Sequence, residues 1–158
     1  MTSLSTAHFK EVVGHFATGV VVVAATTDAG PAGFTCQSFA ALSLEPLLVT
    51  FAATTEGNSW PRIREVGRVG ISVLAVDQES VARALASSSP TKFDDVSLVE
   101  LPNGAPGLVG ALAHIEGDIS SVTTFGDHDI VVVSITGLMS FPGSPLLYYR
   151  GGFGTFQS

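Results

Sequence analysis

One short polar stretch interrupts an otherwise apolar part of the chain. Thr35, Cys36, Gln37 and Ser38 bring two hydroxyls, a thiol and an amide into a segment with apolar neighbours. If this segment is a strand, alternation places Thr35 and Gln37 on one face and Cys36 and Ser38 on the other. Such polar groups need hydrogen-bond partners, which either the protein or a ligand supplies. The pattern alone is more typical of a half-exposed structural strand.

A second group of residues is suited to holding an anion. Asn58 and Ser59 precede a short predicted helix, whose free amide groups and dipole attract negative charge, and Arg62 and Arg64 lie close in sequence. A phosphate would fit there, and an ordinary helix cap is the alternative. Lys92 follows a serine-rich stretch; it either meets the same phosphate or pairs with the acidic residues after it.

Two further candidates lie late in the chain. His128 stands in a predicted glycine-containing turn between two strands, where it either contacts a ligand or is simply solvated. Tyr149 and Arg150 belong to an apolar and aromatic segment that forms either core or a pocket wall.

Other chemistries lack their signatures. His114 and Glu116 share a strand face but have no third ligand at a diagnostic spacing, so we predict no metal centre. The nucleophile elbow of the hydrolases, the Rossmann glycine pattern and the phosphate-binding Walker loop are all missing from the sequence.

Charge and hydropathy exclude several classes of protein. Seven Lys and Arg against 14 Asp and Glu give a net charge of -7, which argues against general nucleic-acid binding. The longest apolar runs, residues 20–25 and 47–53, are far shorter than the roughly 18 residues of a membrane span. The start of the chain does not have the pattern of a secretion signal, and there is one cysteine, so we expect a cytoplasmic protein.

The elements that must position these residues are mainly strands. We predict strands at residues 20–26, 33–42, 47–53, 69–76, 112–122, 130–138 and 146–150. Phe9, Val12, Val13 and Phe16 form one stripe of an opening helix capped by Ser5 or Thr6. Two further short helices are expected, one capped by Ser59 and closed by Gly67, the other capped by Asp77 and ending in residues 87–90.

This pattern favours a closed or nearly closed antiparallel barrel in a single domain, residues 1–158. Charged residues make up only 13% of the chain, which suggests that part of the surface is hidden.

Taken in order, the segments resemble the short-chain flavin reductase family, the reductase components of two-component flavin-dependent monooxygenases. The stretch 33–44 is especially similar to reductases that serve aromatic and steroid-ring hydroxylases. The resemblance rests on residues 16–23, 33–49, 58–60, 73–78, 92–93, 110–113, 126–128 and 145–151.

The resemblance implies a mainly β, Greek-key-like split barrel that binds FMN, with a few short helices. It also implies a homodimer with flavin near the subunit interface. By that analogy the flavin rings and ribityl chain meet Phe34, Thr35, Cys36, Gln37 and Ser38, and the same cleft is lined by Phe51, Ala52 and Ala53. The phosphate is held by Asn58, Ser59 and Lys92, with Trp60 and Phe93 beside them.

His128, with Tyr149 and Arg150, would then face the nicotinamide nucleotide, and His128 would position it. Hydride transfer from NADH to flavin needs no acid or base from the protein in its central step, so no catalytic triad is expected. Cys36 is expected to pack, because nothing near it in sequence lowers its pKa.

The resemblance thus implies an NAD(P)H-dependent flavin reductase that releases reduced FMN or FAD to a separate monooxygenase. Arg150 is the only basic residue on the expected nicotinamide side, which favours NADH over NADPH. The alternatives are a non-enzymatic electron carrier that keeps its flavin tightly bound, and a split-barrel domain that has lost flavin.

Overall fold

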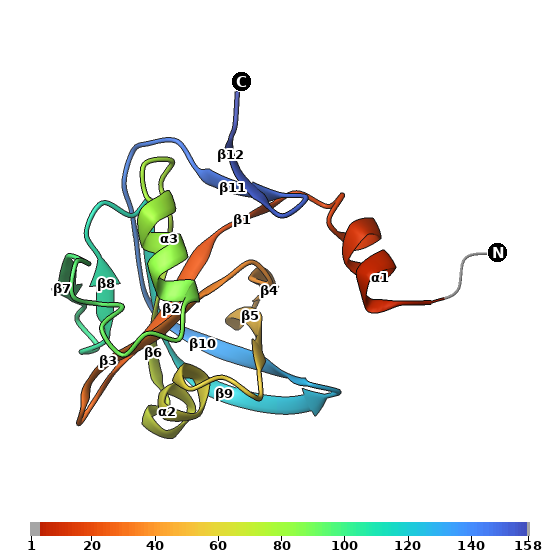
Figure 1. The fold of residues 1–158 in the computed structure, drawn as a ribbon. Coiled ribbons are helices and arrows are strands. Elements are labelled where there is room, and N and C mark those ends of the chain that lie inside the picture. Colours follow the sequence, from red (N-terminus) through yellow and green to blue (C-terminus); the bar gives the residue numbers. More distant parts are fainter. Residues whose placement is uncertain (1–3, 158) are drawn as a thin grey trace.

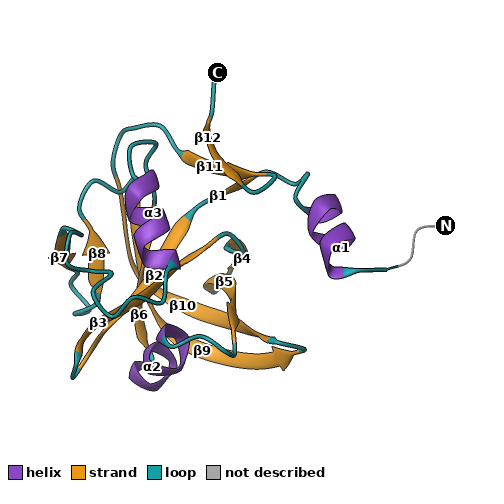
Figure 2. Cartoon of the chain, in the orientation of Figure 1, coloured by secondary structure: helices purple, strands orange, loops and turns teal. Residues whose placement is uncertain are grey.

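The computed structural model describes residues 4–157, and strands make up most of it (Figure 1, Figure 2). Seven strands form one antiparallel sheet in the order β3-β2-β6-β9-β10-β5-β4. They are β2 (Val21–Thr27), β3 (Gly30–Cys36), β4 (Ala40–Leu44), β5 (Leu47–Thr54), β6 (Arg68–Val73), β9 (Ala113–Phe125) and β10 (His128–Ser140).

Smaller elements surround this sheet. Three strands form a second sheet and two form a short ribbon: β1 (Thr18–Gly19), β11 (Leu146–Tyr149) and β12 (Gly152–Thr155), then β7 (Leu98–Glu100) and β8 (Pro106–Leu108). The helices are α1 (Thr6–Val13), α2 (Ser59–Val66) and α3 (Glu79–Ala86). The prediction of a mainly β, antiparallel fold with a few short helices is confirmed. None of these helices is long and apolar enough to cross a membrane.

The large sheet curls until the chain after β3 reaches β5. The Ser38 hydroxyl donates to the Ala52 carbonyl oxygen at 3.0 Å and accepts from the Ala52 amide at 2.8 Å. These two bonds join the β3 end of the sheet to β5, although β3 and β5 are not neighbours in the strand order. The result is a barrel that closes at this point without a continuous ladder.

Strand β2 is buried on both faces, which explains its unbroken run of apolar residues. Val21 and Val23 pack into one core with Phe51, and α2 contributes to that core. Val22 and its neighbours of the same parity pack into a second core, to which α3 and β8 contribute. Alternate residues of one strand therefore fix the positions of α2 and α3 on opposite sides of it.

The opening helix forms where the sequence predicts it, and Ser5 is its N-cap, accepting from the His8 amide. However, no residue of α1 is buried. Phe9, Val12 and Val13 are 65%, 55% and 49% exposed, and Phe16 lies beyond the end of the helix. The apolar stripe is thus present, and the other residues of the 4–157 range leave it exposed.

Four predicted strands differ from the observed ones by more than one residue at an end. The strand expected over 112–122 runs on to Phe125, and the one expected over 130–138 runs from His128, which was predicted in a turn, to Ser140. The strand expected over residues 33–42 is two strands, because the Ser38–Ala52 bonds take residues 37–39 off the ladder. The strand expected over 69–76 ends at Val73, and beyond it Ala75 makes only an isolated bridge to Pro145. The short strands β1, β7, β8 and β12 were not predicted.

The N-caps of α2 and α3 were each predicted one residue away from the observed position. The N-cap of α2 is Asn58, and Ser59 is the first helical residue; its hydroxyl accepts a hydrogen bond from Lys92. The N-cap of α3 is Gln78, not Asp77. The Gln78 side chain accepts from the Ala75 amide and donates to the Val109 carbonyl, so it is held by tertiary partners that the local sequence does not reveal.

Candidate functional site

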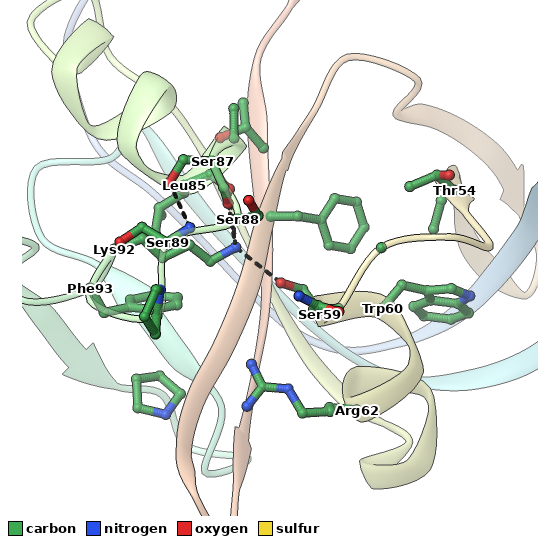
Figure 3. A pocket seen from close by; sticks show the side chains of 18 of the residues that line it. Thr54, Ser59, Trp60, Arg62, Leu85, Ser87, Ser88, Ser89, Lys92 and Phe93 are labelled. Carbon is green, nitrogen blue, oxygen red and sulfur yellow. Dashed lines mark hydrogen bonds between the residues drawn. The ribbon is translucent and has the colours of Figure 1, made fainter.

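A cavity of about 690 Å³ lies between the first turn of α2 and the segment that follows α3 (Figure 3). We call it the charged cavity. Apolar walls come from Phe34, Ala53, Trp60, Leu85 and Phe93. Its polar and charged lining residues are Thr35, Thr54, Asn58, Ser59, Arg62, Ser87, Ser88, Ser89, Lys92 and Asp94.

Lys92 is the half-buried cation of this cavity. Its ammonium group donates to the Ser59 hydroxyl at 3.0 Å, the Ser87 carbonyl at 3.2 Å and the Leu85 carbonyl at 3.4 Å. Burial lowers the pKa of Lys92, and the positive charge of Arg62 lowers it further. Two positive charges therefore share the cavity, and an anion bound between them would relieve their repulsion.

Helix α2 is fixed so that its first residues face the charged cavity. Trp60 and Ile63 are buried, and the Trp60 ring packs edge-on against Phe51 with centroids 5.8 Å apart. The helix ends at Gly67, whose left-handed backbone (φ 79°) suits glycine. The Asn58 side chain makes no capping hydrogen bond, so it and the free amides of the first turn remain available to a ligand.

A buried carboxylate ties the β9–β10 hairpin to this helix. Asp129, only 4% exposed, accepts from the Trp60 indole nitrogen at 2.8 Å and from the Thr124 hydroxyl at 2.6 Å. Arg64 lies 3.6 Å from the same carboxylate. The hydrogen bond from Thr124, followed by that from Trp60, lowers the pKa of Asp129.

The role of Asp129 was not predicted from the sequence. A signal was present, because a strand that begins with His128 alternates its faces and directs the next residue inward. A carboxylate at an inward position of an apolar strand requires buried donors. Which donors they are depends on Trp60 and on Thr124, and only the fold brings these together.

A second cavity, of about 840 Å³, lies beside the break between β3 and β4. We call it the apolar cavity. It is lined by Val13, Gly14, Phe16, Ala17, Thr18, Gly19, Val20, Val21, Gln37, Ser38, Phe39, Ala40, Val73, Tyr148 and Arg150. The backbone amide of Arg150 donates to the Gly14 carbonyl at 3.0 Å and so ties β11 to the end of α1.

One polar atom in the apolar cavity lacks a partner. The Thr18 hydroxyl oxygen is buried and makes no hydrogen bond within the structure. A buried polar group without a partner is costly, and a ligand in this cavity would supply one.

Residues at and just after the end of β3 contribute to both cavities. Thr35 lines the charged cavity, and Gln37, two residues later, lines the apolar one. A ligand with a phosphate at one end and a flat ring system at the other would therefore follow this segment.

Most of the predicted flavin and nicotinamide contacts line one cavity or the other. In the charged cavity are Phe34, Thr35, Ala53, Asn58, Ser59, Trp60, Lys92 and Phe93. In the apolar cavity are Gln37, Ser38 and Arg150. Neither set of lining residues includes Cys36, Phe51, Ala52, His128 or Tyr149.

Several predicted contact residues already have protein partners. The Thr35 hydroxyl donates to the Ala82 carbonyl at 2.6 Å, and the Ser38 hydroxyl is bonded to Ala52. Phe51 is buried in the core. Cys36 is also buried, and burial raises the pKa of its thiol, which favours a packing role.

His128 stands at the exposed tip of the β9–β10 hairpin. Its Nδ1 lies 2.8 Å from the Asp127 carboxylate, and this hydrogen bond is the main cause of the lowered pKa of Asp127. Figure 1 shows the tip well separated from β11, so within one chain the fold does not gather His128 with Tyr149 and Arg150. Its cross-strand partner Thr54, however, lines the charged cavity.

No cluster of three or more His, Cys, Asp or Glu residues suited to a metal ion occurs within residues 4–157. The site consists of cations, hydroxyls, amides and rings.

Comparison with known proteins identifies what this geometry is similar to. Residues 13–157 match the family model described as a flavin reductase like domain. The reductase subunit HsaB of a flavin-dependent monooxygenase from Rhodococcus jostii is 42% identical over 146 residues, which are 92% of this chain and 75% of that protein. An NADH-dependent FMN reductase from Agrobacterium fabrum is 36% identical over 149 residues, 94% of this chain and 85% of that protein.

A solved structure is similar over nearly the whole chain. It is an NADH:FAD oxidoreductase from Streptomyces globisporus, in complex with NAD and FAD fragments. The TM-score is 0.92 at 31% sequence identity, and the match covers 99% of this chain and 98% of that one.

Proposed function

This chain belongs to the flavin reductase-like family, and we propose that it works as the NADH-dependent reductase of a two-component monooxygenase. It oxidises NADH, reduces FMN or FAD, and supplies the reduced flavin to a separate oxygenase. The observation that carries this proposal is the pair of adjoining cavities, one with two facing cations and one apolar, at the end of β3.

The charged cavity suits the flavin phosphate. Lys92 and Arg62 supply positive charge, Ser59 and the serines after α3 supply hydroxyls, and Asn58 has a free amide. Charge-assisted hydrogen bonds of this kind are the strong ones in phosphate recognition. We assign the phosphate to Asn58, Ser59 and Lys92, as the family resemblance implies.

The ring system then extends along residues 35–38 toward the apolar cavity. Because the Thr35 and Ser38 hydroxyls are bonded to Ala82 and Ala52, we assign the contacts there to backbone groups and to Gln37. When bound, NADH and flavin supply the redox chemistry, a hydride passing from the nicotinamide ring to the flavin. The protein aligns the two rings and excludes water.

We further propose a homodimer. The covered face would include the exposed stripe of α1, where Phe9, Val12 and Val13 are 65%, 55% and 49% exposed. Other large apolar side chains are exposed on the edge strand β4, at the start of β5, and at and just after the end of β10: Leu42, Leu44, Leu47, Leu138, Met139 and Phe141. Apolar surface of this extent is typical of protein interfaces, and the low charged share of the chain agrees with it.

We place the protein in the cytoplasm, because its single cysteine is free and buried. His128 is assigned to the nicotinamide nucleotide from its position next to Thr54, at the rim of the charged cavity.

The proposal is tested by steady-state NADH oxidation with no flavin, with FMN and with FAD, alongside the visible spectrum of the purified protein. Saturable activity that depends on added flavin supports a reductase using flavin as a diffusible substrate. A yellow protein whose flavin stays bound and is reduced by neither NADH nor NADPH would instead support an electron carrier. A colourless protein that binds no flavin and does not oxidise NADH contradicts both functions.

A further inference from the structure

Arg62 is the one side-chain cation of the charged cavity to which the structure of residues 4–157 assigns no partner. Its guanidinium makes no hydrogen bond or ion pair within these residues, whereas Lys92 makes three hydrogen bonds. Figure 3 shows the Arg62 side chain extending from α2 toward the middle of the cavity, across from Lys92.

The two cations therefore differ in what they offer a ligand. An ammonium group has three N–H donors, and those of Lys92 are directed at Ser59, Leu85 and Ser87. Lys92 thus contributes charge from a fixed position. A guanidinium has five donors in a planar fork that matches two phosphate oxygens, and all five donors of Arg62 are free for a ligand.

The charge balance of the cavity supports a doubly charged ligand group. Asp94 is the only carboxylate among the described lining residues, and it forms no ion pair with Lys92 or Arg62. Arg62 and Lys92 are also close enough for the charge of one to lower the pKa of the other. A phosphate monoester, close to a dianion at neutral pH, or the pyrophosphate of a dinucleotide would neutralise both cations.

We propose that Arg62 binds the flavin phosphate directly and, together with the charge of Lys92, lets this protein distinguish FMN and FAD from unphosphorylated riboflavin. This inference rests on the proposed function, since it takes flavin as the ligand of the charged cavity. Lys92 supplies a fixed charge, and Arg62 supplies the directional contact.

The neighbouring arginine on the same helix has a different role. Arg64 lies 3.6 Å from the buried Asp129 carboxylate and does not line the charged cavity. Two arginines separated by one residue thus face different partners, as helical geometry requires. From the sequence alone, Arg62 and Arg64 are equally good candidates for binding an anion. In the structure only Arg62 of these two lines the charged cavity.

The test measures flavin binding without NADH, because NADH carries phosphates of its own. Wild type, Arg62→Gln and Arg62→Lys are titrated with riboflavin, FMN and FAD, and binding is followed by flavin fluorescence. The matched control is Arg83→Gln. Arg83 is an exposed arginine of α3 that pairs with Glu79 and lines neither cavity.

We expect Arg62→Gln to weaken FMN and FAD binding by about tenfold, the effect of losing a charged hydrogen bond. Riboflavin binding should change by less than about twofold, within the scatter of surface substitutions. Arg62→Lys should recover part of the loss, and Arg83→Gln should behave as wild type with all three flavins. In steady state, Arg62→Gln should raise the KM for flavin and leave kcat unchanged.

Equal weakening of riboflavin and FMN by Arg62→Gln would overturn the inference, as would unchanged FMN binding. If the wild-type protein binds the three flavins with equal affinity, the Arg62 inference fails and the reductase function stands. If it binds none of them and does not oxidise NADH, the proposed function fails as well.

Discussion

The two cavities differ in how completely a single chain builds them. In the charged cavity, Lys92 is anchored by three acceptors and α2 is held by the buried Trp60. In the apolar cavity, Phe16 is 79% exposed, and the Thr18 hydroxyl has no partner. One chain therefore holds the side chains of the charged cavity in place and leaves the apolar cavity partly open.

Physical chemistry accounts for this difference. Charged groups must be held in place by hydrogen bonds, and a nearby chain segment supplies those bonds as soon as the domain folds. Apolar surface needs only to be covered, and a second copy of the chain or a flat ligand can cover it. This difference between the cavities would not hold if a monomer could bind flavin and NADH in the apolar cavity without a second chain.

The largest effect is expected from Val12→Asp. Val12 is 55% exposed on the α1 stripe and lines neither cavity. A carboxylate at an apolar interface remains unpaired, which costs several kcal/mol, so we expect a monomer and a loss of NADH oxidation of about 100-fold. Size-exclusion chromatography with light scattering gives the oligomeric state, and steady-state rates give the activity.

The matched control is Ala7→Asp, which places the same carboxylate on the opposite side of α1, in its first turn, where negative charge is favourable. It should remain dimeric and active. A Val12→Asp protein that is fully active as a monomer would show that one chain completes both cavities.

The next largest effect is expected from Lys92→Gln, which tests the charged cavity. Loss of the fixed charge should weaken FMN and FAD binding by about 10- to 100-fold, with a smaller effect on riboflavin. Arg83→Gln, which removes one charge from α3, is the control. Equal losses of affinity for all three flavins would mean that Lys92 acts only by holding the segment after α3, through its bonds to the Leu85 and Ser87 carbonyls.

The lowered pKa of Lys92 adds a pH dependence to this prediction. The affinity for FMN should hold while the ammonium is protonated and fall as pH rises through a pKa below the ordinary 10.5. Lys92→Gln should lose this alkaline decline. Titrations across the alkaline range, with folding monitored by circular dichroism, measure it.

The charged cavity was also the part that the sequence could predict. The local sequence indicated either an anion site or a helix cap at Asn58 and Ser59, and only the family resemblance grouped Lys92 with them. The structure brings all three to one cavity. The family resemblance is confirmed. It predicted a split barrel, whereas the strand pattern alone predicted only a closed or nearly closed antiparallel barrel. The choice of Arg62 over Arg64 was not predictable, because it depends on where Asp129 lies.

The apolar cavity could not be predicted from local patterns. It lies beside residues 37–39, where Ser38 leaves the strand to bond Ala52, a contact between residues 14 positions apart. The stripe of α1 was recognised, but a helical pattern does not reveal which surface covers it. Within residues 4–157 the Thr18 hydroxyl has no hydrogen-bond partner, and no residue of α1 is buried.

A smaller effect is expected from His128→Ala. The side chain is half-exposed and bonded to Asp127, so its loss should raise the KM for NADH by roughly 2- to 10-fold and leave flavin binding unchanged. Unchanged KM for NADH and unchanged turnover would remove His128 from the nicotinamide site. The same substitution in the Val12→Asp background asks whether His128 acts within its own chain or across the interface.

The smallest effect on activity is expected from Asp129→Asn, which tests the link between the hairpin and α2. The carboxylate accepts from Thr124 and Trp60, and these bonds lower its pKa below the ordinary 3.8. A lowered folded-state pKa gives stability that is present above the unfolded-state value and is lost as pH falls through the folded-state value.

Wild type should therefore lose stability in acid more steeply than Asp129→Asn, while at neutral pH the variant should have a Tm lower by several degrees. Thermal unfolding between pH 7 and about pH 3 measures both. Asp118→Asn, at an exposed position of β9, is the control and should follow wild type. An Asp129→Asn protein with the acid profile of wild type would mean that other carboxylates govern acid unfolding. A change in flavin KM at neutral pH as large as that of Lys92→Gln would mean that the position of α2, more than its charge, governs phosphate binding.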